Sequence, residues 1–126
     1  MIPKFRAWNM PFGPKGPMQE MVYGKASSIL AFAEMSPDKY IVEQYTGLKD
    51  ANGNMIYEND IIKYFGANKR VTIKTTYGIV FYDSDHGCFN SRIQNEEHNK
   101  GGISPLNDLI VGNVHENPEL VEAQHD

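Results

Sequence analysis

The chain has 126 residues, one cysteine and a formal net charge of −4. This length suits one domain that buries roughly two-thirds of its unfolded surface, so we expect a single domain over residues 1–126. The lone Cys88 excludes an internal disulfide, and the first residues lack the apolar stretch of a secretory signal. No apolar run approaches the length needed to span a membrane. We therefore expect a cytoplasmic protein without a membrane segment.

The charges are unevenly distributed along the chain. Residues 1–82 carry a net charge of +3, whereas residues 83–126 carry −7. A basic cluster can contact the phosphates of a nucleic acid, but it is also the ordinary solvent side of a strand and discourages edge pairing. Because the whole chain is acidic, the second interpretation is favoured. The segment between residues 61 and 82 has four basic residues and no acidic one: Lys63, Lys69, Arg70 and Lys74.

The first segment alternates in hydropathy as a half-buried strand does. This pattern predicts a strand over Ile2–Trp8, with Phe5 and Ala7 on one face. Five prolines and glycines then interrupt regular structure, which predicts a loop over residues 10–20. A short strand over Met21–Gly24 follows.

The segment from Ser28 to Met35 is ambiguous. Its apolar residues are too continuous to give a clear period, so it fits either a buried strand or a two-turn helix capped by Ser27 or Ser28. We favour the strand. Residues 36–38 are expected to turn the chain into a further strand over Tyr40–Thr46.

A tight turn is predicted at the centre of the chain, between Asp50 and Gly53. The Asp50 side chain can accept a hydrogen bond from the backbone two residues on, and Asn52 suits the centre of a type I turn. Gly53 supplies the positive φ that closes a three-residue hairpin loop. This stretch therefore specifies architecture rather than a reaction.

A second turn is expected at Glu58–Asp60, before a strand over Ile61–Phe65, and it resembles the entry into the second strand of SH3-like barrels. Asn59 is the best non-glycine residue for a left-handed position in this turn. Asp60 has the chemistry of a general base, but a carboxylate beside a turn more commonly accepts backbone N–H bonds. We therefore interpret Asp60 as structural.

A long strand is predicted over Val71–Tyr77, after a hairpin loop at residues 66–69. Gly78 permits a bulge or bend, the device that lets a strand turn a barrel corner. The sheet then continues over Ile79–Tyr82 and, after a turn, into Cys88.

The turn after Tyr82 is the one place where metal ligands gather. Its donors are too few and too divergent for a zinc site, and its composition is that of an ordinary hairpin loop, so we expect no metal and no cofactor. Cys88 is expected to be a small buried hydrophobe rather than a nucleophile. The four candidate ligands are Asp83, Asp85, His86 and Cys88.

The last third begins with a polar segment, residues 94–104, that we expect to be a mobile loop. A final strand follows over Leu109–Val114. Asn117 as cap and Pro118 at the first position then predict a short C-terminal helix, before a free tail at residues 122–126.

Three blocks of sequence resemble the YopX family of phage and prophage proteins. They are residues 4–9 (Lys-Phe-Arg-Ala-Trp-Asn), the run from Gln44 to Lys63, and residues 112–120 (Gly-Asn-Val-His-Glu-Asn-Pro-Glu-Leu). The chain departs from the family pattern where Asn59 replaces the usual Gly, Asn9 the usual Asp and His115 the usual Tyr. The resemblance implies an uncharacterised phage-encoded protein with a small β-barrel structure and no assigned chemistry.

Together these patterns predict an all-β fold, a small SH3-like or barrel-like antiparallel sheet with a short C-terminal helix. The aromatic residues exceed what one small core can hold, so some must point outward, where they favour interfaces. We expect a non-enzymatic, homo-oligomeric binding module that contacts a phage or host protein. Its first candidate contact residues form a predicted exposed face: Trp8, Tyr57, Lys63 and Tyr64.

Two alternatives remain open. The chain could bind single-stranded nucleic acid through the basic cluster around Arg70, with Tyr64 or Phe65 as a surface on which a base stacks. A hydrolytic enzyme ranks lowest; it would place Asp60 or Glu58 near His115, yet no acid, base and nucleophile are grouped in the sequence.

Overall fold

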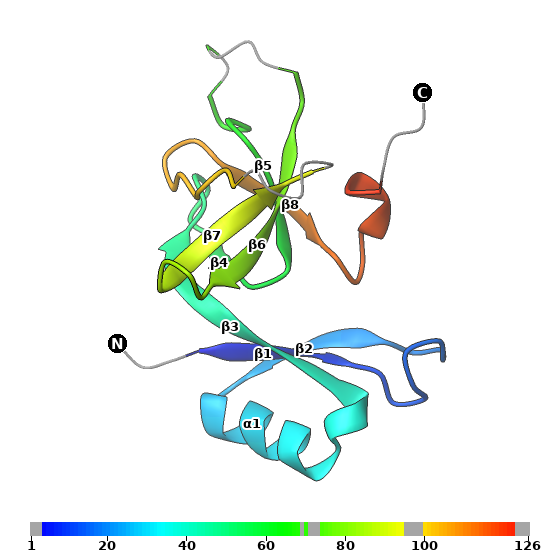
Figure 1. Ribbon diagram of the computed structural model, residues 1–126. Helices are drawn as coiled ribbons and strands as arrows, with labels where there is room; N and C mark the ends of the chain where they lie inside the picture. Colours follow the sequence, from blue (N-terminus) through cyan, green and yellow to red (C-terminus); the bar gives the residue numbers. More distant parts are fainter. Residues whose placement is uncertain (1–3, 69, 71–73, 95–99, 123–126) are drawn as a thin grey trace. The chain divides into compact units, whose positions relative to one another are not determined.

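The computed structural model describes residues 4–68, 70, 74–94 and 100–122. The chain divides into two compact units, Met1–Tyr45 and Thr46–Asp126. Strand β3 (Tyr40–Lys49) continues from the first unit into the second. The described strands form two four-stranded antiparallel sheets, and the first of them continues along β3 from the first unit into the second; Figure 1 labels the strands.

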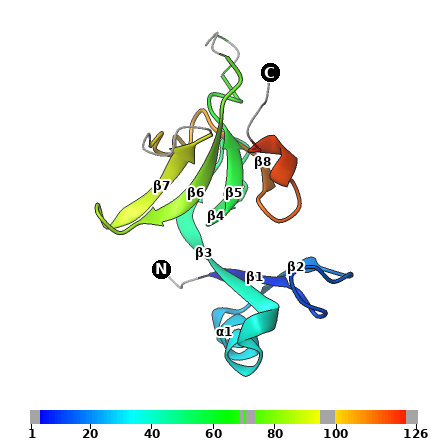
Figure 2. The same ribbon diagram turned by 45° about the vertical axis from the view of Figure 1, so that its right-hand side comes forward.

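In the first unit, β1 (Phe5–Asn9) is the central strand. It pairs antiparallel with β2 (Glu20–Gly24) on one side and with the first half of β3 on the other. Helix α1 (Ala26–Met35) lies against one face of this layer, as Figures 1 and 2 show. The helix buries Ile29, and the single-turn 3-10 helix η1 (Pro37–Lys39) leads from it into β3.

A cross-strand ion pair lies on the sheet of the first unit. Arg6 of β1 and Glu43 of β3 are register partners, and Arg6 Nε donates to Glu43 Oε1 at 2.8 Å. Both side chains are buried, with 4% and 1% of their surface exposed. A buried charge is costly unless it is paired, so each partner requires the other.

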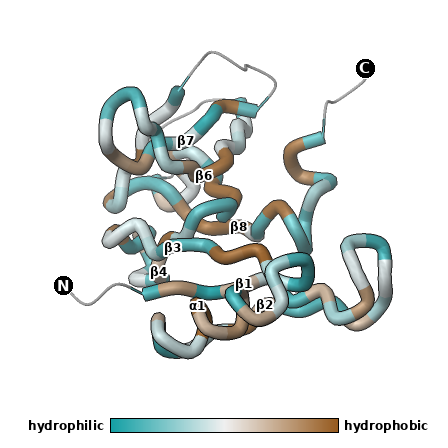
Figure 3. Tube along the Cα trace, turned by 60° about the horizontal axis from the view of Figure 1, so that its bottom comes forward, coloured by the Kyte–Doolittle hydropathy of each residue, from teal (hydrophilic) through white to brown (hydrophobic). Residues whose placement is uncertain are grey.

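The preference for a strand at residues 28–35 was wrong, because this segment is helix α1. The continuous apolar run hides a helical pattern in which Ile29 alone is fully buried. Neither Ser27 nor Ser28 caps the helix: the residue at the cap position is Lys25, whose side chain makes no capping hydrogen bond. Hydrophobic colours run along much of α1 in Figure 3.

The second unit is built on a curled four-stranded sheet in the order β7-β6-β5-β8. Strand β5 shifts register against β8 between Ile61 and Ile62, which marks a β-bulge. Strand β4 lies beside the end of β3. The strands are β4 (Met55–Tyr57), β5 (Asp60–Lys63), β6 (Tyr77–Asp83), β7 (Cys88–Ile93) and β8 (Leu109–Asn113).

The core of the second unit is formed by Ile56, Ile62, Tyr64 and Val80. The Tyr64 hydroxyl hydrogen-bonds to Ser91 Oγ inside this core. A Cβ atom added at Gly78 would collide with the Tyr64 ring, so only glycine lets β6 approach this closely. Gly78 therefore serves packing against Tyr64.

The predicted mainly β fold, with a curled antiparallel sheet, is confirmed. The predicted strand over Val71–Tyr77 is not: residues 71–73 lie outside the described residues, residues 74–76 have no regular structure, and β6 begins at Tyr77. The predicted C-terminal helix is the 3-10 turn η2 (Pro118–Leu120). Asn117 does not cap η2 with its side chain, because its Oδ1 accepts a hydrogen bond from Asn113 N.

Replacing Glu43 by Ala tests the buried pair in the first unit. The change leaves the Arg6 guanidinium buried without this carboxylate, so we expect the free energy of unfolding to fall by about 3–5 kcal/mol. Chemical denaturation followed by circular dichroism measures this change. Glu34→Ala, at an exposed position of α1, is the matched control and should change stability by less than about 0.5 kcal/mol. Equal effects of the two substitutions would contradict the role of the pair.

Candidate functional site

The loop between β1 and β2, residues 10–19, is held in one conformation by the side chain of Gln19. Gln19 Nε2 donates to the carbonyl oxygens of Pro14 and Gly16, each at 2.9 Å, and approaches that of Gly13 at 3.4 Å. Gln19 Oε1 accepts a hydrogen bond from Trp8 Nε1 at 2.8 Å. One amide therefore ties several points of the loop to strand β1.

Backbone hydrogen bonds and glycines shape the same loop. Met10, which is buried, donates its N–H to the carbonyl of Lys39 at 2.7 Å. Gly13 N donates to Met10 O, and Gly16 N donates to Gly13 O, so two tight turns follow one another. Gly13 has φ +89°, a conformation that glycine adopts at little cost.

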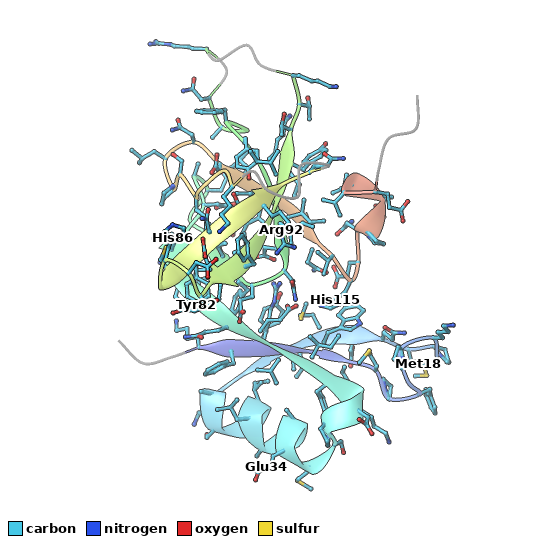
Figure 4. All side chains as sticks on the ribbon, viewed as in Figure 1. Met18, Glu34, Tyr82, His86, Arg92 and His115 are labelled. Atoms are coloured by element: carbon cyan, nitrogen blue, oxygen red, sulfur yellow. The ribbon has the colours of Figure 1, made fainter. Side chains whose placement is uncertain are left out.

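This ordered loop presents two large apolar side chains to solvent, Phe12 at 65% exposure and Met18 at 75%. Met18 has φ +63°, which is unfavourable for a residue with a Cβ. Figure 4 shows the labelled Met18 on this loop. The backbone thus holds a strained conformation in which an apolar side chain points into water, and strain of this kind gathers at functional sites.

The exposure expected for three predicted contact residues was wrong. Trp8 is 7% exposed, Tyr57 5% and Tyr64 9%. Trp8 uses its indole N–H to hold Gln19, and Tyr64 is part of the core of the second unit. Consecutive residues are buried in β1 at Trp8 and in β4 at Tyr57, so alternation does not turn these side chains outward, and Tyr64 follows β5 in a turn.

The predicted basic residues differ in their exposure to solvent. Lys63, at the end of β5, is half-buried, whereas Arg70 and Lys74 are exposed. Lys69 lies outside the described residues. Of the two predicted stacking residues, Phe65 is the exposed one.

The central turn is organised by the Asp50 carboxylate. Its Oδ1 accepts hydrogen bonds from Asn52 N at 3.0 Å and Asn54 N at 2.9 Å, and Gly53 takes φ +85°. Its Oδ2 accepts from Ile110 N at 3.0 Å, sixty residues away in sequence. The same buried side chain therefore closes the turn and fastens it to β8.

The second turn is held by the backbone of Asn59 and by the side chain of Asp60. Asn59 has φ +66°, and its backbone donates to Val80 O and accepts from Val114 N. The buried Asp60 accepts Tyr57 N at 2.8 Å through Oδ2. Asp60 thus has the hydrogen bond expected of a carboxylate that holds a turn.

In the turn after β6, one candidate metal ligand is committed to protein partners. The buried Asp83 accepts hydrogen bonds at Oδ2 from Lys100 Nζ (3.0 Å), His86 Nδ1 (2.9 Å) and Asn90 Nδ2 (3.2 Å). Its Oδ1 accepts from Asp85 N. The Lys100 hydrogen bond, with those of Asn90 and His86, holds the pKa of the Asp83 carboxyl well below its usual range. Among the described residues, no group of three potential metal ligands comes together.

Two cations lie close to the ring of Phe81 on the same hairpin. Arg92 Cζ is 4.8 Å and Lys100 Nζ 5.9 Å from the ring centroid. Arg92 and Lys100 form an isolated antiparallel bridge. Lys100 is therefore positioned both by its backbone and by its contacts with Asp83 and Phe81, and Figure 4 labels Arg92 and His86 on this hairpin.

The expected burial of Cys88 was wrong, because this free cysteine is exposed at the start of β7. His115 is half-buried, and its backbone N–H donates to Asn113 Oδ1. His98 and His125 lie outside the described residues, as do parts of the predicted mobile loop and tail.

The comparisons with known proteins identify the family. The family model described as "YopX protein" matches residues 4–122 of the chain. The chain belongs to the YopX family. A solved structure, the crystal structure of protein EF1440 from Enterococcus faecalis, is similar with 25% sequence identity and a TM-score of 0.58, covering 97% of this chain and 99% of that one. No curated protein matches the chain.

The three sequence blocks shared with the YopX family fall on structural positions described above. The first block is strand β1 with Arg6 and Trp8, and the second contains the Asp50 and Asp60 turns. The third runs from the end of β8 into η2. Within the described residues, no helix is long and apolar enough to cross a membrane.

Sequence reasoning missed Gln19 and Lys100, which organise the first loop and the Asp83 cluster. Neither belongs to a recognisable motif, since Gln19 acts on carbonyl groups three to six residues before it and Lys100 acts on a residue 17 positions away. A polar residue near the end of a proline-glycine loop was the one available signal for Gln19.

Replacing Lys100 by Gln tests the electrostatics of the turn after β6. Loss of the ammonium removes the largest cause of the lowered pKa of Asp83, so that pKa should rise towards the ordinary value of about 3.9. A carboxyl group with a lowered pKa stabilises the folded state at pH values above its unfolded pKa, and this stabilisation is lost as the pH falls. The variant should therefore lose less stability than wild type when the pH is lowered below about 4. Carboxyl-carbon NMR titration measures this pKa. Lys74→Gln, an exposed control, should leave the pKa unchanged, and a variant pKa that stays low would contradict the assignment.

Proposed function

We propose that this chain is a non-enzymatic protein-binding module that self-associates and serves as an accessory protein of a phage or prophage. One observation carries the proposal: the pinned loop at residues 10–19, which exposes Phe12 and Met18. An ordered loop with exposed apolar side chains loses little conformational entropy on binding, so more of its contact energy appears as affinity.

Further exposed apolar side chains in the first unit support this proposal. Helix α1 exposes Leu30 at 45%, Phe32 at 46% and Met35 at 82%. Phe32 and Met35 are three residues apart and therefore neighbours on the helix surface. Tyr23, on edge strand β2, is 62% exposed. Large apolar side chains that are exposed to solvent favour protein interfaces when they gather on one face.

The engaged carboxylates also favour binding over catalysis. Asp50, Asp60 and Asp108 accept backbone N–H groups, and Asp83 is held by Lys100. The hydrogen bonds of these four carboxylates stabilise turns and loops of the protein. A hydrolase built on Asp60 would first have to release its bond with Tyr57 N.

The phage context and the cellular location are part of the proposal. Membership of the YopX family supports a phage or prophage origin. The exposed thiol of the single cysteine, Cys88, suits a reducing compartment such as the cytoplasm of the bacterial host.

Sedimentation equilibrium tests the proposal. Wild-type protein should show a concentration-dependent increase in mass, and Phe12→Ser combined with Met18→Ser should weaken the association constant about tenfold or more, because both apolar anchors are lost. Gln19→Ala keeps those side chains but frees the loop, so it should weaken association to a smaller extent.

Leu106→Ser is the matched control, since it removes an apolar side chain that is 86% exposed in the second unit. It should leave the association constant unchanged. A wild-type protein that stays monomeric at every concentration, or a Phe12/Met18 variant that associates like wild type, would refute the proposed role of the loop.

A further inference from the structure

Phe65 occupies an unusual backbone conformation in the second unit. It directly follows the core residue Tyr64 and has φ +56°. A left-handed conformation is uncommon outside glycine and asparagine and is a true outlier for a bulky aromatic residue. The Phe65 side chain is nevertheless 39% exposed. Burial in the core therefore does not account for an aromatic residue at this position.

The strained residue is held by a neighbouring loop. Asp108, itself buried, accepts Phe65 N at Oδ1 (3.1 Å) and Ser104 N at Oδ2 (2.7 Å). Ala67 N also donates to Asn107 O at 2.9 Å. Residues 64–68 and 104–108 thus lie side by side and support each other. The ring of Phe65 is presented on a preorganised surface.

The described charged residues of the chain segment that carries Phe65 are positive. Arg70 and Lys74 are exposed, and Lys63 is half-buried one residue before Tyr64. Arg70 N donates to Asn68 Oδ1, which connects its backbone to the same loop. The segment from residue 61 to residue 82 contains no acidic residue, and the acid of the neighbouring loop, Asp108, is only 2% exposed.

We propose that Phe65, Lys63, Arg70 and Lys74 together form a surface that binds single-stranded nucleic acid, with an unpaired base stacked on the Phe65 ring and phosphates near the cations. Aromatic rings beside clustered cations are the two components of sequence-tolerant single-strand binding. A duplex offers phosphates but keeps its bases stacked inside, so it could not use the ring. This site shares no residue with the loop at residues 10–19.

The structure changes the residues assigned to this function. Tyr64 is unsuitable as a stacking surface, because its ring is in the core and its hydroxyl bonds to Ser91. Phe65 takes that role because its left-handed backbone places the ring at the surface. Lys69 lies outside the described residues and has no part in the assignment.

Fluorescence anisotropy with a labelled oligothymidylate tests the proposal. Wild-type protein should bind at low ionic strength, with an affinity that falls as salt is added. Phe65→Gly suits the left-handed backbone and removes the ring, so its melting temperature should equal or exceed that of wild type while its affinity falls about tenfold. Arg70→Gln with Lys74→Gln should reduce the slope of log affinity against log salt by about 1–2.

Tyr82→Ala is the matched control, because Tyr82 is an aromatic residue of the same unit with 49% exposure, and it should bind like wild type. The Phe12/Met18 variant should also bind like wild type, which separates this site from self-association. Three results would each overturn the proposal: no binding at low ionic strength, equal affinity of the folded Phe65→Gly variant, or equal affinity for a duplex. Displacement of the oligonucleotide by polyglutamate as readily as by unlabelled oligothymidylate would instead indicate an acidic protein ligand and would also overturn it.

Discussion

The carboxylate of Asp50 is the interaction on which the second unit most depends. It closes the central turn through Asn52 N and Asn54 N, and it joins that turn to β8 through Ile110 N. Ala51 N reinforces the same junction by donating to Asp108 O. Because buried N–H groups that lose an acceptor are costly, one side chain fixes the position of a hairpin against a strand far away in sequence.

Other polar side chains, two of them buried and one half-buried, repeat this arrangement. Asp108 supports Phe65, Asp60 supports Tyr57 N, and Gln19 supports the loop between β1 and β2. No buried side-chain N or O atom of the described residues lacks a hydrogen-bond partner. The hydrogen bonds of these polar side chains thus fix the conformations of loops, and the loops expose apolar and aromatic side chains. The function we propose is accordingly recognition rather than catalysis.

Local patterns in the sequence predicted the turns and the mainly β fold, because Asp50 bonds nearby backbone N–H groups and Gly53 and Asn59 suit a positive φ. The same reasoning failed where distant segments decide the outcome. It left a helix open at residues 28–35 but favoured a strand where helix α1 lies, since an apolar run without period does not reveal that Ile29 alone is fully buried. It placed Trp8, Tyr57 and Tyr64 outside, because alternation assumes one solvent-facing side for each strand. The contacts by which Gln19 holds the first loop, with Trp8 and with two carbonyl oxygens, match no sequence motif and could not be predicted.

The most direct test of this account is the stability and self-association of Asp50→Ala. If Asp50 is structural, the free energy of unfolding should fall by about 2–5 kcal/mol, because three backbone N–H groups lose a charged acceptor. Asp38→Ala, at an exposed position of η1, should change it by less than about 0.5 kcal/mol. An Asp50→Ala protein as stable as wild type that has lost self-association would contradict the account, since it would place this carboxylate at a binding site.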